Sequence, residues 1–147
     1  MKQPHVIALL LCLLSSDDSL AKSPEIIGPV RTRTRARLGR TLVLTCMANP
    51  HGDSDLTVIY WLVNGSFPEA LNTSRISEMD ESTSSNGTVQ RNLKLKNVTT
   101  EDLSSTYVCV VMNPEGITKK HVTLRTHRKK MRIKKHLLTV PFSKQSG

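Results

Sequence analysis

The cysteines are the residues of this chain best suited to covalent chemistry, and their positions predict one disulfide. Cys12 lies in an apolar run, Val6–Leu14, close to a lysine at the start of the chain. Such a run, followed by small residues, is typical of a secretory signal peptide, which is removed. Cys46 and Cys109 then remain, and a lone pair in a secreted domain is normally oxidised. Closing so long a loop stabilises a fold by about 4 kcal/mol in the chain-entropy model.

The predicted signal peptide covers residues 1–21 and ends with Ser19, Leu20 and Ala21, which suit a signal peptidase. Its apolar run is too short to span a bilayer, and polar residues follow it at once, which disfavours a buried helix. No later segment has the composition of a membrane anchor. We therefore expect a soluble, secreted, extracellular protein.

Four N-glycosylation sequons fit that compartment. They begin at Asn64, Asn72, Asn86 and Asn97. A single sequon often occurs by chance, but four within one short stretch of a secreted chain are more informative. We expect most of them to carry glycan.

The histidines offer no second kind of chemistry. They are His5, His51, His121, His127 and His136. None stands at a telling distance from a serine or cysteine partner, and their spacing is not that of metal ligands. The sequence therefore predicts no enzyme, no metal site and no cofactor.

Charge divides the chain into three parts. Residues 1–40 carry a net charge of +4, residues 41–118 carry −5, and residues 119–147 carry +10 without one acidic residue. We expect a basic N-terminal arm with a first strand (22–40), a domain (41–125) and a basic, flexible tail (126–147). For a secreted protein the fitting polyanion is sulfated polysaccharide rather than nucleic acid, although a merely solvated tail is an alternative. The predicted contacts are Arg125, Arg128, Lys129, Lys130, Arg132, Lys134 and Lys135.

Between the basic segments, apolar and polar residues alternate with the period of a half-buried β-strand. "TLVLTC" places Leu42, Leu44 and Cys46 on one face, and "NLKLKNV" repeats the pattern with Leu93 and Leu95. "LTVIYWLV", "TYVCVVM" and "HVTLR" are further β-rich runs, separated by clusters of turn-forming residues. This spacing predicts an all-β sandwich of two antiparallel sheets.

Four core residues narrow this to an immunoglobulin-like β-sandwich. Trp61 follows the Cys46 strand, and Tyr107 stands two residues before Cys109. In immunoglobulin domains the disulfide joins the two sheets, the Trp packs on it and the Tyr makes a corner hydrogen bond. Asp102 lies one residue further from Tyr107 than is usual, so we expect a slightly altered corner.

Side chains alternate along a strand, so inward Trp61 and inward Cys109 fix the outward residues of two strands. Immunoglobulin topology makes these strands neighbours in one sheet. The predicted apolar outer face consists of Leu56, Val58, Tyr60, Leu62, Val108, Val110 and Met112. The other sheet has a polar outer face of Thr41, Val43, Thr45, Asn92, Lys94 and Lys96. An apolar patch on one sheet is a candidate interface, unless an arm or loop covers it.

Asn64-Gly65 is the preferred pair for a two-residue hairpin turn. In that hairpin Phe67 lies opposite Leu62 and shares the outer face with Tyr60, while Glu69 lies opposite Tyr60. Pro68 cannot donate to a ladder, so the returning strand should be short and at an edge. Ordinary hairpin packing is the alternative role for Phe67.

Four stretches within about residues 40–124 are distinctive: "TLVLTC", "IYWLVNGSF" with "PEAL", "STYVCVVMNPEG" and "KKHVTL". Together they resemble the family of secreted interleukin-18-binding proteins. The resemblance implies a single immunoglobulin domain, related to interleukin-1-family receptor ectodomains, that acts as a soluble decoy for the cytokine. It implies that the apolar outer face binds the cytokine, with anchors at Tyr60 and Phe67 and an acidic contribution near Glu69. A third aromatic of the family, a Phe, falls at Leu56.

Two departures from the family widen the range of functions. Some members have a second disulfide, for which 47–49 and 90–92 offer no cysteine, and the basic arms are not part of the family pattern. A decoy for a different interleukin-1-family cytokine is therefore open. So are a glycosaminoglycan-binding adhesion or matrix module and a secreted form of a multi-domain cytokine receptor.

Overall fold

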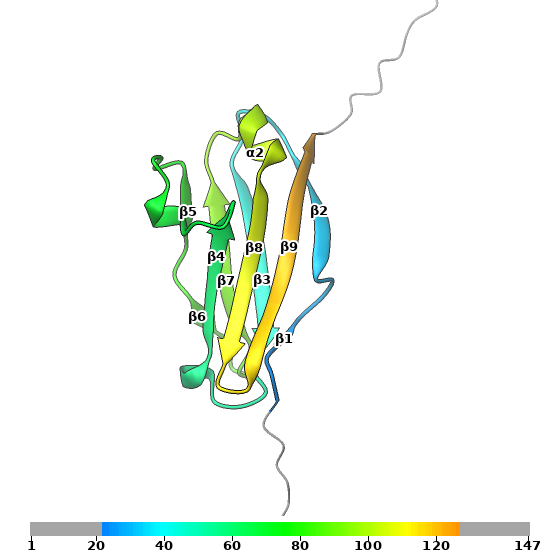
Figure 1. Cartoon of the computed structure of the whole chain (residues 1–147), viewed down its shortest axis with the longest axis vertical. Coiled ribbons are helices and arrows are strands. Elements are labelled where there is room, and N and C mark those ends of the chain that lie inside the picture. The colour runs from blue at the N-terminus through cyan, green and yellow to red at the C-terminus, as the bar shows by residue number, and fades with distance from the viewer. Residues whose placement is uncertain (1–21, 127–147) are drawn as a thin grey trace, which may run out of the picture.

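A computed structural model describes residues 22–126 as two β-sheets packed face to face (Figure 1). The first sheet has the spatial order β1 (Glu25–Ile26), β3 (Leu42–Asn49), β7 (Val89–Leu95) and β5 (Ile76–Glu78), and β6 (Ser82–Thr83) also pairs with β7. The second has the order β2 (Arg31–Ala36), β9 (Gly116–Thr126), β8 (Thr106–Asn113) and β4 (Val58–Val63). Short helical turns η1 (Ser54–Leu56), η2 (Pro68–Ala70) and α2 (Thr100–Ser104) lie in the connections. The predicted all-β immunoglobulin-like sandwich is confirmed.

β2 runs parallel to its neighbour, β9, whereas the other strand pairs are antiparallel. The chain leaves the first sheet after β1 and turns at Gly28, whose φ of +89° suits glycine. It then enters the second sheet, where Arg31 lies beside His121. The second sheet is therefore mixed rather than fully antiparallel as predicted. The segment 22–40, expected as a basic arm with a first strand, supplies one strand to each sheet.

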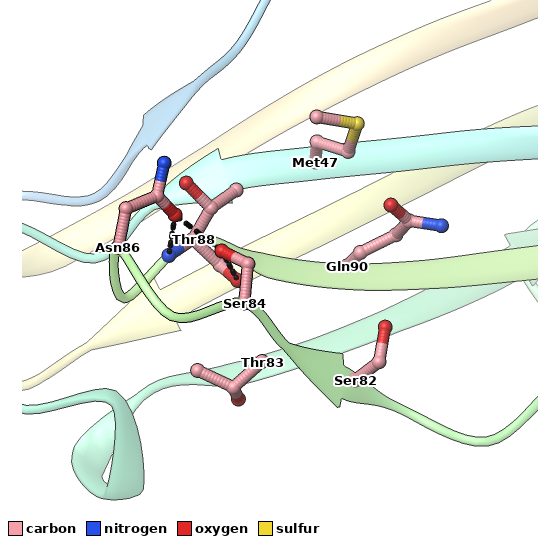
Figure 2. A pocket seen from close by; sticks show the side chains of 7 residues that line it. All are labelled: Met47, Ser82, Thr83, Ser84, Asn86, Thr88 and Gln90. Atoms are coloured by element: carbon pink, nitrogen blue, oxygen red, sulfur yellow. Dashed lines mark hydrogen bonds between the residues drawn. The ribbon is translucent and has the colours of Figure 1, made fainter.

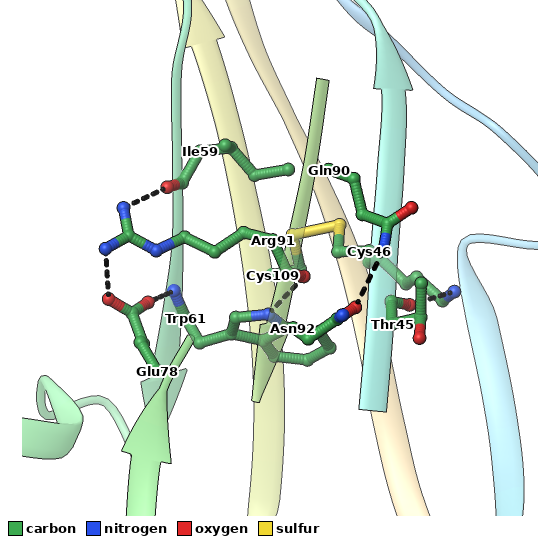
Figure 3. The surroundings of a disulfide bond; sticks show 10 residues. Thr45, Cys46, Ile59, Trp61, Glu78, Gln90, Arg91, Asn92 and Cys109 are labelled. Carbon is green, nitrogen blue, oxygen red and sulfur yellow. Dashed lines mark hydrogen bonds and ion pairs between the residues drawn. A yellow bond between two sulfur atoms is a disulfide. The ribbon is translucent and has the colours of Figure 1, made fainter. Parts of the chain in front are cut away.

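The disulfide and Trp61 join the sheets at the centre of the core (Figure 3). Cys46 on β3 and Cys109 on β8 are bonded, with their Cα atoms 6.3 Å apart. Trp61 lies opposite Cys109 on β4 and is fully buried. Its Nε1 donates to the carbonyl oxygen of Arg91 at 3.0 Å, and Arg91 lies opposite Cys46. One indole ring therefore contacts both sheets beside the bond that links them.

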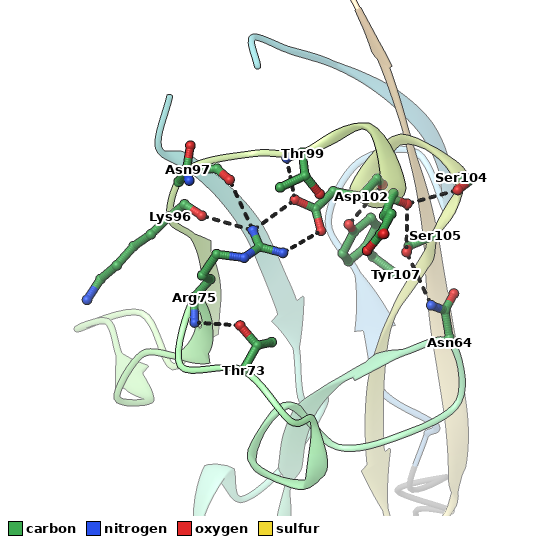
Figure 4. A network of polar contacts seen from close by, with 11 residues as sticks. Asn64, Thr73, Arg75, Lys96, Asn97, Thr99, Asp102, Ser104, Ser105 and Tyr107 are labelled. Carbon is green, nitrogen blue, oxygen red and sulfur yellow. Dashed lines mark hydrogen bonds and ion pairs between the residues drawn. The ribbon is translucent and has the colours of Figure 1, made fainter. Parts of the chain in front are cut away.

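The tyrosine corner closes one end of the sandwich (Figure 4). The Tyr107 hydroxyl donates to the carbonyl oxygen of Asp102 at 2.9 Å. Its hydrogen bond thus forms despite the longer spacing, because α2 carries that carbonyl to the ring. Burial, reinforced by the Asp102 charge, raises the pKa of Tyr107 to about 12.

The Asp102 side chain makes a second tie at this end. Arg75, just before β5, reaches both of its carboxylate oxygens, with Nη1–Oδ2 at 3.1 Å and Nη2–Oδ1 at 3.3 Å. The backbone N–H of Thr99 donates to the same carboxylate at 2.8 Å. Burial acts to raise the pKa of Asp102, but the hydrogen bonds from Arg75 and Thr99 outweigh it and hold that pKa below its usual range.

Several sequence predictions lie outside the described residues. They are the signal peptide 1–21 and the polyanion contacts Arg128, Lys129, Lys130, Arg132, Lys134 and Lys135. Arg125 is described and is exposed near the end of β9. Within residues 22–126 no helix is long and apolar enough to cross a membrane.

Candidate protein-binding surface

The outer face of the second sheet has the side-chain alternation that the sequence predicts. On β4, Ile59 and Trp61 are fully buried and Val63 is 2 % exposed. The alternate residues point the other way: Val58 is 52 % exposed, and Tyr60 and Leu62 are half-buried. β4 therefore directs one side into the core and the other outward.

Strand register aligns outward residues of β4, β8 and β9 in three rows. The rows are Val58–Met112–Ile117, Tyr60–Val110–Lys119 and Leu62–Val108–His121. The first row is apolar throughout, and its end members are more than half exposed. The other two rows are apolar on β4 and β8 and become basic or polar on β9. We call the apolar members of these rows, with Leu56 and Phe67, the apolar face.

One residue of the predicted contact set, Val110, is almost fully covered. Its side chain is only 2 % exposed. It points outward, yet it lies in the middle row between Tyr60 and Lys119. It is also absent from the core cluster that fills the space between the sheets. Its neighbours on the same face therefore cover it, and it supports the surface instead of offering contact area.

Tyr60 and Phe67 lie side by side as predicted, with ring centroids 5.4 Å apart and planes tilted by 44°. Asn64 and Gly65 both have positive φ, 51° and 82°, as a type I′ turn requires. Val63 and Ser66 close this turn with two backbone hydrogen bonds of 2.8 and 3.0 Å. The turn thereby returns Phe67 to the apolar face, where it is 47 % exposed.

The predicted returning strand does not form. The ladder stops at the Val63–Ser66 bridge, and Pro68–Ala70 make the short helix η2. Pro68 begins that helix because its fixed φ suits the first helical position and it has no N–H to pair. Glu69 is consequently exposed on η2 and does not lie opposite Tyr60.

Leu56 also differs from the predicted placement. It ends helix η1, two residues before β4 begins at Val58, so strand parity does not orient it. Its side chain is 60 % exposed. The Asp53 carboxylate caps η1 by accepting from the backbone N–H of Asp55 at 2.9 Å, which holds this turn beside the apolar face.

A charged pair occupies the open edge of β4 (Figure 3). Arg91 Nη1 donates to the carbonyl oxygen of Ile59 at 3.2 Å, and the Glu78 carboxylate accepts from the backbone N–H of Trp61. Arg91 Nη2 and Glu78 Oε2 are 3.4 Å apart. Both residues come from the first sheet, so the pair ties the sheets together and occupies backbone groups that another strand would need. Strand periodicity alone could not identify Arg91, because it stands at an inward position of β7.

The four sequon asparagines are exposed, and none belongs to a strand of the second sheet. Asn64 lies in the turn after β4, where its Oδ1 accepts from the backbone N–H of Thr106 at 2.9 Å. Asn72 follows η2 and Asn97 follows β7. Asn86 lies in the turn between β6 and β7. Glycan at these positions would start outside the strands that carry the apolar face.

Figure 2 shows the shallow hollow around Asn86, on the first sheet. Its lining residues are Met47, Ser82, Thr83, Ser84, Asn86, Thr88 and Gln90. The Asn86 Oδ1 accepts from the Ser84 hydroxyl and from the backbone N–H of Thr88. These polar atoms shape the turn, and the lining offers no charged group for a ligand. Across residues 22–126, no group of three or more His, Cys, Asp and Glu side chains could hold a metal ion.

Ile117 on β9 belongs to the apolar face and was missed from sequence. Ile117 is 57 % exposed and extends the apolar row of Val58. Only "HVTLR" reads as a strand, whereas β9 runs from Gly116 to Thr126. The alternation of inward and outward residues begins already at Ile117 and could have indicated the longer strand. Two consecutive lysines, Lys119 and Lys120, interrupt the apolar and polar pattern there. Lys120 points inward, where its Nζ donates to the carbonyl oxygen of Thr45 at 3.1 Å, and burial lowers its pKa.

Comparisons with known proteins agree with this architecture. The family model "Immunoglobulin domain" matches residues 23–113. The mouse interleukin-18 receptor accessory protein is 33 % identical over 104 residues, which is 69 % of this chain and 17 % of that protein. Its human counterpart is 30 % identical over 106 residues, 71 % of this chain and 18 % of that protein. The rat interleukin-1 receptor type 2 is 31 % identical over 107 residues, 69 % of this chain and 26 % of that protein.

The matched region thus spans about a sixth to a quarter of the length of these curated relatives. The similarity relates this domain to parts of interleukin receptors. The names of these relatives describe receptors and not enzymes. Since the family match covers more than half of its residues, the chain belongs to the immunoglobulin-domain family.

Proposed function

We propose that this protein is a secreted decoy that binds interleukin-18, or a related interleukin-1-family cytokine, through the apolar face. Three observations support the proposal: the signal-like start of the sequence, the resemblance to interleukin-18-binding proteins, and the similarity to two kinds of interleukin receptor. The similarity to receptors supports a cytokine partner. The choice of interleukin-18 rests on the resemblance and is the finer part of the proposal.

The apolar outer face on one sheet carries this proposal furthest. Leu56, Val58, Phe67 and Ile117 are between 47 % and 60 % exposed. In a two-layer sandwich no third layer of the same domain covers such side chains, so contiguous apolar surface is a marker of a partner. Within residues 22–126 no arm or loop covers them, since their side chains keep this exposure in the folded domain.

Tyr60 and Phe67 have the features of binding anchors. Aromatic rings offer a large contact area at a low cost in conformational entropy, and they dominate many interfaces. The type I′ turn and the Glu78–Arg91 pair order the backbone around the two rings before any partner arrives. A surface that is already ordered loses less entropy on binding. Met112, Leu62 and Val108 would complete the contact around these anchors, and Glu69 on η2 would lie at its rim.

Sequon positions are compatible with binding at this face. None of the four asparagines lies on β2, β4, β8 or β9, although Asn64 directly follows β4. Glycans are bulky and solvated, and at these positions they would start outside the strands that carry the apolar face.

A titration tests the function itself. The full secreted chain is immobilised and exposed separately to interleukin-18 and to an interleukin-1, with an unrelated helical cytokine as control. The decoy proposal expects saturable binding to one of the first two with a Kd below about 0.1 μM, typical of a specific interface. It also expects the bound cytokine to be unable to activate reporter cells. Equal, weak signals for all three cytokines would contradict it.

A receptor fragment is the second candidate, because the relatives are several times longer than the matched region. In that case one domain would hold only part of the binding surface. The same titration distinguishes the two: a decoy neutralises the cytokine alone, whereas a single receptor domain binds weakly and leaves signalling intact.

A further inference from the structure

A row of basic side chains borders the apolar face on the same sheet. Its members are Arg31, Arg33 and Arg35 on β2 and Lys119 and Arg125 on β9, and we call this set the basic strip. All five are exposed. His121 lies among them, opposite Arg31.

Strand geometry brings these cations together. β2 alternates arginine with threonine, and Thr32 lies beside buried Val122, which turns the threonines inward and the arginines outward. Successive outward residues on one strand are about 6.6 Å apart, and neighbouring strands are separated by about 4.8 Å. Arg35 lies directly beside Arg125 in the parallel pair. Three charges are therefore regularly spaced along β2, with Arg125 beside Arg35 at one end and Lys119 two residues before His121 at the other.

No acidic residue balances these charges. The sequences of β2 and β9, RTRTRA and GITKKHVTLRT, contain no Asp or Glu. The ion pairs found within residues 22–126 are those of His51, Arg75 and Arg91, and none involves the strip. Like charges held this close repel one another, so a multivalent anion would be favoured there.

Protection of a sheet edge explains only part of this pattern. Charged residues on an edge strand prevent unwanted pairing, and β2 is an edge strand. β9, however, lies between β2 and β8, so Lys119 and Arg125 protect no edge. The strip also continues in sequence into the basic segment that follows β9, which has six more Lys/Arg between Arg128 and Lys135.

From this arrangement we infer that the basic strip on β2 and β9 is a binding site for a linear sulfated polysaccharide of the heparan type. A linear polyanion matches a row of cations that lies along the strands, and each sulfate or carboxylate can pair with a guanidinium. The inferred site belongs to the folded domain, shares Arg125 with the polyanion contacts predicted from the sequence, and adds four residues of β2 and β9 to them. Lys119 lies opposite Val110 at its border with the apolar face, so the polysaccharide would bind beside a protein partner.

The test uses full-length protein and a heparin-derived dodecasaccharide, with Kd measured over a range of NaCl concentrations. The strip variant carries Arg31→Thr, Arg33→Thr and Arg35→Thr, which keep the β-branched character of the strand. The matched control carries Arg40→Thr, Lys94→Thr and Lys96→Thr, which remove the same charge outside the second sheet. Counterion release predicts that the strip variant lowers the slope of log Kd against log [NaCl] by about 2, from about 0.7 for each of three lost contacts. Its Kd in 0.15 M salt should weaken at least tenfold more than that of the control.

Thermal melting and size exclusion establish whether each variant folds and elutes like the unchanged protein. If the β2 variant misfolds, Lys119→Thr with Arg125→Thr replaces it and should lower the slope by about 1.4 on the same scale. Equal heparin affinity of the strip and control variants would overturn the inference, since the tail alone would then account for binding. A strip variant that keeps heparin affinity but loses cytokine affinity would also overturn it, because the strip would then belong to the protein interface. Loss of heparin binding without any cytokine binding would support the inference while contradicting the decoy function.

Discussion

The two sheets have similar inner faces but very different outer faces. Inside, each contributes one cysteine and a row of aliphatic side chains to a single core. Outside, the first sheet presents Thr45, Asn92 and Lys94, and its apolar residues Val43 and Met47 are separated by Thr45 on β3. The second presents the apolar face next to the basic strip. Packing of the core constrains the inner faces of both sheets. It does not constrain the outer faces, so their difference is better explained by binding to other molecules than by folding.

Val43 and Val58 show this difference with the same residue type. Their side chains are 44 % and 52 % exposed, at outward positions of opposite sheets. A single exposed valine is normal on a protein surface, whereas Val58 continues into a row of apolar residues. Contiguity, and not exposure, therefore distinguishes the candidate interface.

The largest effect is expected from Trp61→Ala, which breaks the core that both sheets share. Loss of a fully buried indole and its hydrogen bond to Arg91 should lower the free energy of unfolding by about 3–5 kcal/mol. Tyr60→Ala is the internal control on the same strand and should cost far less stability, since its ring is partly exposed. Urea denaturation measures both; equal losses would contradict the inward and outward assignment.

Removing the aromatic anchors should separate binding from stability. Tyr60→Ala and Phe67→Ala should each weaken cytokine binding by about 2–4 kcal/mol, or roughly 30- to 1,000-fold. The reason is that truncation deletes a preordered ring from the middle of the proposed contact. Kd values for each variant, measured by surface plasmon resonance, check this. Variants that melt normally and bind like the unchanged protein would show that the anchors are misplaced.

The corner at the end of the sandwich supports both sheets and should respond to acid. Asp102→Asn should lower the free energy of unfolding at pH 7 by about 2–3 kcal/mol, because Arg75 loses a charged partner. The folded pKa of Asp102 is below the ordinary 3.8, so its contribution is full above that pH and is lost as the pH falls through the folded pKa. Stability measured from pH 7 to pH 2 should therefore fall less steeply for the variant. Parallel curves would contradict this role.

The smallest effect is expected from removal of the predicted glycosylation site nearest the apolar face. Ser66→Ala abolishes the sequon at Asn64 and leaves that asparagine in the turn, where it accepts from Thr106. Cytokine affinity should stay within a few-fold, because Asn64 lies beyond the end of β4. The measurement compares Kd before and after the change. A large gain in affinity would mean that glycan shields the face.

Much of the sandwich follows from residues whose positions leave few alternatives. The period of two places Leu44, Cys46, Trp61 and Cys109 inside, and a one-residue shift would turn every one of them outward. Asn64-Gly65 specifies its turn for a similar reason, since both residues tolerate positive φ. The outer face of β4 then follows by parity. These features depend on local sequence and on one covalent bond.

Other features depend on contacts between distant segments, which alternation does not encode. The parallel approach of β2 to β9 decides where Arg31, Arg33 and Arg35 lie. Val110 is covered because neighbours from two other strands flank it. Arg91 stands at an inward position only because Glu78 and the Ile59 carbonyl meet it at the edge. Sequence patterns predicted the direction of side chains well, but they could not predict what each would meet.

One matched pair of variants tests most directly whether the outer face of the second sheet binds a cytokine. Val58→Asp and Val43→Asp place the same charge at similarly exposed valines on opposite sheets. Their costs to folding should be alike, and melting temperatures would verify this. Burying an unpaired carboxylate in an interface is unfavourable, so Val58→Asp should weaken interleukin-18 binding by at least tenfold, while Val43→Asp leaves the Kd unchanged. Equal affinities for the two variants, or a loss confined to Val43→Asp, would contradict the proposed binding face.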